Sequence, residues 1–254
     1  MYLLRSRFAA LSLLAAVTFT SACQRAAFVA KPQLAPVTAQ PVSKTLADDV
    51  TAAATIAPYH QKVVEQMGEV LGTAPVAIAK NPGESPLANF VGDIQRLRAS
   101  QVLGRPIDIG VMTNGGLRAG LPAGAITLGS VFELMPFENE LVVLEVPGTV
   151  AQQLFDYAAR LKMALSNVTY AVGADGKPAS ILIGGKPFEP GKTYSVAISD
   201  YLAGGGDQMV FFKAVKPLST GVLLRNAIAD HIRALTKQGQ AVEAKVEGRV
   251  KAIQ

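Results

Sequence analysis

The order of apolar and polar residues predicts that helices and strands alternate along most of this chain. Apolar runs of strand length occur at residues 69–79, 107–112, 140–146, 170–172, 180–183, 194–198 and 246–253. Apolar residues at helical spacing predict helices over residues 57–68, from 86 on, 128–134, from 149 on, and 221–237. Ser85 and Thr149 are expected to cap two of these helices. Because no internal repeat and no second boundary follow residue 55, we expect one domain over residues 55–254.

The start of the chain carries a different pattern, that of a secretion signal. Arg5 and Arg7 precede an apolar stretch at residues 8–19, which is too short to span a membrane as a mature helix. Small residues follow this stretch and lead to a single cysteine. We therefore expect residues 1–22 to be a signal peptide.

The cysteine at the end of this signal is Cys23, and its setting resembles a bacterial lipobox. Cleavage before Cys23 would make it the lipidated first residue of an exported bacterial lipoprotein, in the periplasm or at the outer membrane. The alternative is a plain signal peptide cut near Ala22, which would leave an unpaired thiol. Residues 23–54 are rich in Ala, Pro, Thr and Val without helical or strand period, and we expect them to form a flexible tether.

The composition and charge of the chain argue against a nucleic-acid polymer as a ligand. Half of the 254 residues are apolar, and the formal charge of +5 falls to +3 when Arg5 and Arg7 are removed with the signal. No run of Lys and Arg with interleaved aromatic residues is present, so we expect no nucleic-acid polymer as a partner.

Three separated stretches combine turn-forming residues with side chains suited to binding: residues 113–118, 136–139 and 200–207. Together they contain aromatic rings for stacking, a carboxylate for sugar hydroxyls and a guanidinium for phosphate, which is what a nucleoside or nucleotide requires. Each stretch taken alone has a structural explanation. Phe137 can anchor its loop, Asp207 can cap its own turn, and the glycines can form simple bends.

Five motifs in a fixed order carry a resemblance to a known family. They are Ser-Pro-Leu-Ala-Asn at residues 85–89 with Asp93, Asn-Gly-Gly-Leu-Arg at 114–118, Pro-Phe-Glu-Asn at 136–139, Gly-Gly-Asp at 205–207, and Gly-Arg-Val at 248–250. Over residues 58–250 the chain resembles the C-terminal domain of the 5′-nucleotidase family of secreted metallophosphatases. The resemblance implies an α/β (α+β) fold, a single domain with a mixed sheet flanked by helices, that recognises substrate.

The resemblance also implies which residues bind the substrate. The two aromatic rings that enclose the base fall on Phe137 and on Tyr201, where phenylalanine is usual. The aspartate that binds the ribose falls on Asp207, and the arginine after the glycines is Arg118. An amide near the base corresponds to Asn139. Asn114 and Gly116, from the glycine motif, complete the expected substrate-binding set.

The family's two-metal chemistry has no counterpart in this sequence. Two-metal hydrolysis requires several His, Asp and Asn ligands, whereas this chain has only His60 and His231, far apart and without accompanying ligand motifs. Both histidines are more simply explained as packed core residues. No Gly-x-Ser-x-Gly segment supports a Ser–His–Asp triad, although composition alone leaves one open. We therefore expect no catalytic residue, metal ligand or cofactor in this chain.

Three hypotheses follow for function. The first is a split enzyme, in which this lipoprotein recognises the nucleotide and a separate metallophosphatase chain supplies the divalent metals. The second is a non-catalytic nucleoside- or nucleotide-binding lipoprotein for scavenging. The third is a scaffold with a decayed site, and the presence of Arg118, Phe137, Tyr201 and Asp207 counts against it.

Overall fold

The computed structural model of this protein describes residues 39, 43 and 46–252. The predicted signal peptide, Cys23 and most of the predicted tether therefore lie outside the described residues. The chain divides into two units, Met1–Asp49 and Val50–Gln254. The elements below all belong to the second unit.

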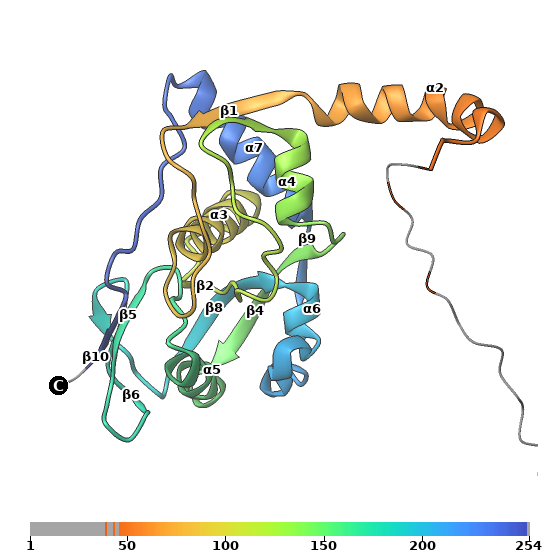
Figure 1. The fold of residues 1–254 in the computed structure, drawn as a ribbon. Coiled ribbons are helices and arrows are strands. Elements are labelled where there is room, and N and C mark those ends of the chain that lie inside the picture. The colour runs from red at the N-terminus through yellow and green to blue at the C-terminus, as the bar shows by residue number, and fades with distance from the viewer. Residues whose placement is uncertain (1–38, 40–42, 44–45, 253–254) are drawn as a thin grey trace, which may run out of the picture. The chain divides into compact units, whose positions relative to one another are not determined.

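A four-stranded mixed sheet lies at the centre of this unit (Figure 1). Its strands, in spatial order, are β2 (Ile109–Gly110), β8 (Thr193–Ser199), β4 (Glu140–Pro147) and β9 (Leu218–Leu223). β2 runs parallel to β8, whereas β4 runs antiparallel to both β8 and β9. The strands β4 and β8 are buried along most of their length because both faces of the sheet are covered.

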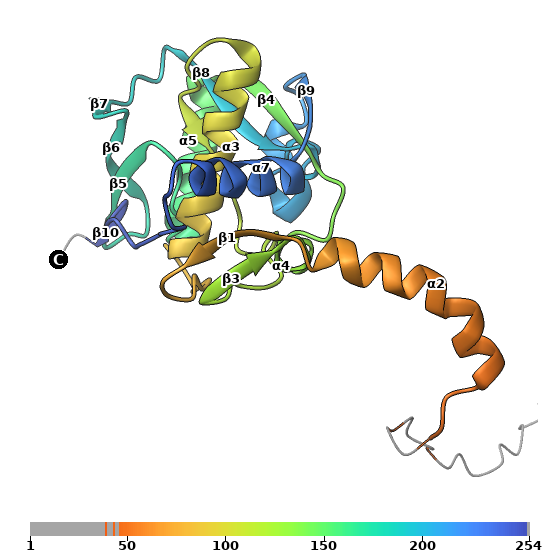
Figure 2. The same ribbon diagram turned by 90° about the horizontal axis from the view of Figure 1, so that it is seen from above.

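Alternate residues of β4 and β8 join different parts of the core. One face packs against α5 (Gly148–Leu161) through Val142, Leu144, Val146, Val196 and Ile198. The opposite face packs against α3 (Pro86–Leu103) and the start of α7 (Leu224–Lys237) through Leu141, Val143 and Ala197. Figure 1 shows the sheet between α3 and α5, and Figure 2 shows α7 lying across α3.

Two smaller sheets complete the fold. One pairs β1 (Val70–Ala74) with β3 (Gly124–Thr127), and the other has the order β10 (Val250–Ala252), β5 (Val168–Val172), β6 (Pro178–Ile183) and β7 (Lys186–Pro187). In the second, β10 is parallel to β5 and the other pairs are antiparallel. Short helical turns α4 (Leu128–Leu134), α6 (Asp200–Ala203), η2 (Gly206–Gln208) and η3 (Val210–Phe212) connect these elements.

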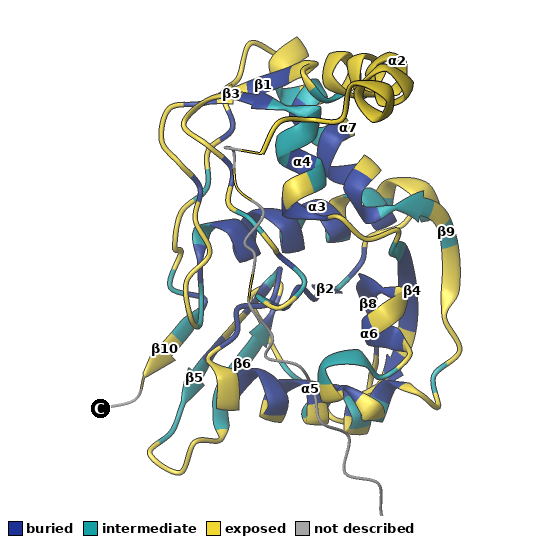
Figure 3. Cartoon of the chain, turned by 45° about the vertical axis from the view of Figure 1, so that its right-hand side comes forward, coloured by how far each residue is buried: buried dark blue, intermediate teal, exposed yellow. Residues whose placement is uncertain are grey.

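The first helix in the described part of the chain, α2 (Val50–Met67), buries none of its residues, and Figure 3 shows it exposed along its length. It begins at Val50, before the predicted start at residue 57 and inside the stretch interpreted as tether. None of the helices in the described part of the chain is both long enough and apolar enough to cross a membrane.

The α/β fold with mixed sheets and flanking helices is confirmed, and α4 has the predicted bounds. The cap at Ser85 is also confirmed, because its side chain accepts a hydrogen bond from the Ala88 N–H. The cap assigned to Thr149 is wrong, since the α5 N-cap is Pro147, which makes no side-chain cap bond. The sequence pattern missed β3, β7 and β9, which are short or interrupted edge strands.

Candidate functional site

A cavity of about 230 Å³ lies where three loops meet at one edge of the central sheet. The residues that line it are Gly115, Gly116, Arg118, Phe137, Asn139, Tyr201 and Asp207. All of the predicted substrate-binding residues except Asn114 are therefore brought together in one place, although they are spread over more than ninety positions of the sequence.

Sheet topology explains this convergence. Because β2 and β8 are parallel, the loops that follow them leave the same edge, and they carry Arg118 and Asp207 respectively. Because β4 is antiparallel to β8, the loop that precedes it, with Phe137 and Asn139, arrives at that edge as well. Tyr201 lies in α6, directly after β8.

The Asp207 carboxylate is held from two sides. Thr113 Oγ1 donates a hydrogen bond to Asp207 Oδ2 at 2.8 Å, and the Tyr201 hydroxyl donates to Asp207 Oδ1 at 3.2 Å. An ionised carboxylate has about four acceptor positions, so two remain for ligand donors such as a pair of sugar hydroxyls. The carboxylate is therefore oriented before any ligand arrives.

The backbone of Asp207 is fixed as well. Its φ of 48° and ψ of 32° are left-handed, a conformation that costs energy for a residue other than glycine. The Tyr157 hydroxyl, from α5, donates to the Asp207 carbonyl oxygen at 2.8 Å and so supports this conformation. Burial raises the pKa of Tyr157, and the neighbouring Asp207 charge adds to the effect, so its hydroxyl stays a donor at neutral pH.

Two glycines allow close approaches beside the cavity. A Cβ on Gly206 would lie 2.4 Å from Tyr201 Cε1, which is too close unless the ring moves, and a Cβ on Gly115 would make a tight contact of 3.2 Å with Asp207 Oδ2. Glycine at these positions therefore lets the backbone lie close to the ring and to the carboxylate.

Phe137 carries the second ring of the cavity, and its loop is held by a buried arginine. The Arg225 side chain, 9% exposed, donates to the carbonyl oxygens of Pro136 at 3.4 Å and Phe137 at 3.5 Å. Its guanidinium also lies 4.0 Å from the centroid of the Phe132 ring. Arg225 thus positions the loop without lining the cavity.

Arg118 lies over the ring of Phe137, with its guanidinium carbon 4.7 Å from the ring centroid. Its backbone is fixed, because the Arg118 N–H donates to the Leu134 carbonyl oxygen at 2.9 Å. The carbonyl oxygen of the preceding residue, Leu117, accepts from Lys80 Nζ at 2.6 Å.

Asn114 has a different place from the one predicted. Its side-chain amide donates to the carbonyl oxygens of Asn81 at 2.7 Å and Gly83 at 3.2 Å, and Asn114 does not line the cavity. In the described structure it ties the loop before α3 to the loop after β2.

The first and last sequence motifs meet away from the cavity and serve the fold. Arg249 donates to both carboxylate oxygens of Asp93, at 3.0 and 2.6 Å, and to Glu247. The Asn89 amide donates to Glu84 Oε1 at 2.8 Å and to the Lys245 carbonyl oxygen at 3.0 Å. These bonds join the C-terminal segment to α3 and do not point to a ligand.

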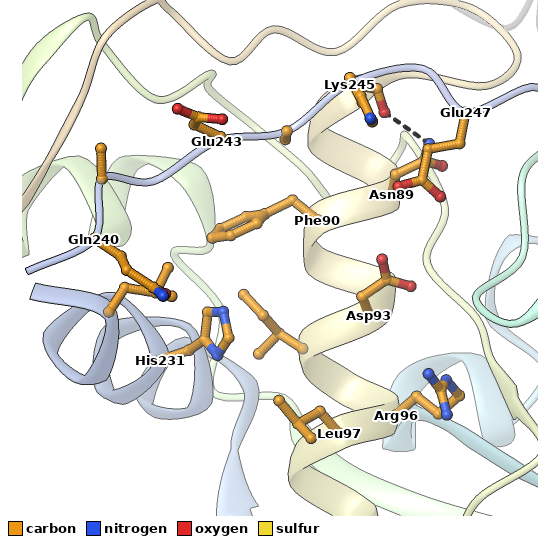
Figure 4. Close-up of a pocket in the computed structure, with 14 residues that line it drawn as sticks. Asn89, Phe90, Asp93, Arg96, Leu97, His231, Gln240, Glu243, Lys245 and Glu247 are labelled. Carbon is orange, nitrogen blue, oxygen red and sulfur yellow. Dashed lines mark hydrogen bonds between the residues drawn. The ribbon is translucent and has the colours of Figure 1, made fainter. Parts of the chain in front are cut away.

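The two histidines lie on different helices, His60 on α2 and His231 on α7, and do not contact each other. His231 is half-buried and packs edge-on against Phe90, with ring centroids 5.7 Å apart, beside a cavity of about 700 Å³ between α3, α7 and residues 240–247 (Figure 4). Burial lowers the pKa of His231, against an opposing effect of Asp93, so the ring is neutral at pH 7. The expectation that His60 is packed is wrong, because it is exposed on α2. Among the described residues, no group of three or more His, Cys, Asp or Glu side chains could hold a metal ion.

Sequence reasoning gave no role to three residues that organise the cavity: Thr113, which lies in the predicted stretch 113–118, and Tyr157 and Arg225, which it did not single out. Thr113 stands next to a recognised motif and could have been found from its hydroxyl beside the glycines. Tyr157 and Arg225 lie on helices far from their partners in sequence, and no local pattern marks them.

Comparisons with known proteins give a consistent answer. A model of the family described as 5′-nucleotidase, C-terminal domain, matches residues 67–216. The trifunctional nucleotide phosphoesterase protein YfkN of Bacillus subtilis is 30% identical over 193 residues, which are 67% of this chain and 12% of that protein. The cell wall protein Lmo0130 of Listeria monocytogenes is 28% identical over 188 residues, 65% of this chain and 23% of that protein.

Among solved structures, this chain is similar to the crystal structure of a 5′-nucleotidase precursor from Thermus thermophilus, with a TM-score of 0.68 and 26% identity. The match covers 82% of this chain and 44% of that chain. This chain thus spans less than half the length of each of the three relatives.

Proposed function

Because this chain belongs to the family of 5′-nucleotidase C-terminal domains, we propose that it recognises a nucleoside or nucleotide outside the cytoplasm. In this proposal it contributes to nucleotide hydrolysis together with a separately encoded dinuclear metallophosphatase. The observation that carries the proposal is the cavity in which Arg118, Phe137, Tyr201 and Asp207 converge.

Each of these side chains has a chemical role in the proposed site. The rings of Phe137 and Tyr201 offer faces for a base, and aromatic stacking is tolerant of which base is bound. Asp207 accepts from two ribose hydroxyls with the positions left free by Thr113 and Tyr201. Arg118 meets the phosphate, for which its planar fork of donors is suited. Asn139 supplies an amide at the same cavity.

The proposal assigns no bond-breaking step to this chain. Its cavity contains one carboxylate, two rings and a guanidinium, which can bind and orient but provide no activated water or nucleophile. The divalent metals belong, in this proposal, to the partner chain. Lipidation of Cys23 would keep the recognition domain at a membrane surface, beside that partner.

The test is a binding and activity experiment on the full-length chain. Calorimetric titration with AMP should show saturable binding, and an Asp207→Asn variant should bind at least about 10-fold more weakly because it loses charge-assisted hydrogen bonds. An Arg105→Ala variant, altered at an exposed ion pair with Glu145 outside the cavity, is the matched control and should bind as the wild type does.

Activity measurements distinguish the split enzyme from the scavenging lipoprotein. With Mn²⁺ or Mg²⁺ and AMP, the chain alone should release no phosphate, and addition of an exported dinuclear metallophosphatase from the same organism should give hydrolysis that depends on Asp207. AMP binding without any gain in hydrolysis would favour the scavenging lipoprotein. Phosphate release by the chain alone, or no heat with AMP or adenosine, would contradict the proposal.

A further inference from the structure

The ring of Phe137 is in contact with the side chain of Arg118. The Arg118 guanidinium carbon lies 4.7 Å from its centroid, within the range of a cation–π contact. Phe137 lines the cavity and is 37% exposed, so its ring is accessible to a ligand. A ligand ring that stacks on the face contacted by Arg118 must therefore displace the guanidinium.

The charge of Arg118 has no better partner in the described structure. Arg105, Arg225, Arg233 and Arg249 all form ion pairs with carboxylates. Across residues 46–252, Arg118 forms no such pair, and the cavity's only carboxylate, Asp207, is bonded to Thr113 and Tyr201 instead. The guanidinium therefore keeps its edge donors for an anion that arrives with the ligand.

Only the side chain of Arg118 needs to move. Its backbone is held by the bond from its N–H to the Leu134 carbonyl oxygen, and the Leu117 carbonyl oxygen is held by Lys80. Asp207 is fixed in both its carboxylate and its backbone. A ligand therefore meets Asp207 in a fixed orientation and the movable guanidinium of Arg118.

We propose that Arg118 occupies the ring-binding position of Phe137 in the free protein and leaves it for the anionic group of the ligand, so that the site favours nucleotides over neutral nucleosides. This inference rests on the proposed function. A neutral nucleoside must break the contact between Arg118 and Phe137 without offering the guanidinium a new partner. A nucleotide replaces that contact with charge-assisted hydrogen bonds to phosphate, which are stronger.

The size of the effect follows from the contact that is lost. An exposed cation–π contact is equivalent to about a 2- to 5-fold change in affinity, which is the penalty expected for adenosine. The phosphate of AMP should recover this penalty and add about 10-fold or more through its bonds to the guanidinium.

The test compares adenosine with AMP on the full-length wild type and on an Arg118→Ala variant. The variant should bind adenosine about 2- to 5-fold more tightly, because the ring is no longer covered, and AMP at least about 10-fold more weakly. Arg105→Ala, which removes an exposed charge outside the cavity, should change neither value. An equal loss for both ligands in Arg118→Ala would overturn the inference while leaving the proposed function intact.

A second measurement requires no ligand. In the NMR spectrum of the free protein, the Arg118 side-chain Nε–H and Cδ–H signals should be shifted upfield by the Phe137 ring and should return to ordinary values in Phe137→Leu and on addition of AMP. Absence of the shift in the free wild type would overturn this inference alone. Failure of the wild type to bind either adenosine or AMP would overturn the proposed function and this inference with it.

Discussion

Asp207 shows how several weak features of single residues combine into one oriented group. Its left-handed backbone, the hydroxyls of Thr113 and Tyr201 on its carboxylate, and the Tyr157 hydroxyl on its carbonyl oxygen all act on the same residue. Tyr201 takes part twice, because its ring lines the cavity and its hydroxyl holds the carboxylate. A phenylalanine there would keep the ring face but lose the bond.

Gly206 should be essential for the position of this ring. In a Gly206→Ala variant the new Cβ would lie 2.4 Å from Tyr201 Cε1, so the half-exposed ring must swing away from the cavity while the fold survives. Loss of one stacking partner should weaken AMP binding by about 5- to 100-fold in a calorimetric titration.

Gly204→Ala is the matched control for this variant. Gly204 has an ordinary φ of −73°, and its added Cβ would approach only backbone oxygens, the nearer at 3.3 Å. It should bind AMP within about 2-fold of the wild type. Equal affinities for Gly206→Ala and the wild type would show that the Tyr201 ring does not contact the ligand.

At the scale of elements, the N-terminal half of α3 acts as an anchor for the end of the chain. Asn89 and Asp93, one turn apart, bind the Lys245 carbonyl oxygen and the Arg249 guanidinium. Glu84, just before the helix, accepts from the N–H groups of Glu247 and Val250. These hydrogen bonds hold the C-terminal segment against α3, and β10 in that segment pairs with β5.

Glu84 should make the stability of the fold depend on pH, because its carboxylate accepts hydrogen bonds from the C-terminal segment. Partial burial raises the pKa of Glu84, but hydrogen bonds from Asn89 and from backbone N–H groups of residues 247–250 outweigh it, so the net pKa lies below the ordinary 4.5. A lowered folded-state pKa stabilises the fold above the unfolded-state pKa, and this stabilisation is lost as pH falls through the folded value.

We therefore expect the free energy of unfolding, measured in urea between pH 6 and pH 3, to fall with acid less steeply in Glu84→Gln than in the wild type. The variant should also be less stable at pH 7, since its amide nitrogen cannot accept the backbone N–H of Val250. Glu65→Gln, which removes one negative charge from an exposed position on α2, controls for the change in net charge. Parallel acid profiles for Glu84→Gln and the wild type would contradict this explanation.

For the molecule as a whole, the buried hydrophobic core lies after α2. No residue of α2 is buried, and the three hydrophobic clusters are formed by residues from Leu71 onward. The family model also begins only at residue 67. We therefore expect α2 to contribute little to the stability of the folded domain.

A chain that begins at Gly68 should therefore fold and bind AMP as the full-length protein does. Loss of the contact between α2 and α4 should lower the melting temperature by no more than about 4 °C, equivalent to about 1 kcal/mol for a domain of this size. Differential scanning calorimetry and AMP titration of both chains would measure this. A broad, non-cooperative transition would show that α2 is part of the core.

The pattern of apolar residues alone determined most of the elements, because β4 is a continuous apolar run, β8 alternates, and α4 carries apolar residues at a three-residue spacing. It failed where tertiary contacts decide, as at β9, whose pairing with β4 shifts register, and at the α5 start. The motif residues of the cavity were identifiable because glycine turns and aromatic residues carry a local chemical signature.

Tertiary structure alone decided which motif residues face the cavity and which serve the fold. Asn114 was predicted to bind substrate, yet its amide donates to backbone carbonyl oxygens. Asn89, Asp93 and Arg249 belong to the same set of motifs, and their partners are carboxylates, a guanidinium and a backbone carbonyl oxygen of this chain. The stacking of Arg118 on Phe137 could not be predicted from the sequence either, because Arg118 lies in the loop after β2 and Phe137 in the loop before β4. A local pattern records the conformation of its own segment, whereas the direction of a polar side chain depends on which distant atoms the sheet topology brings within reach.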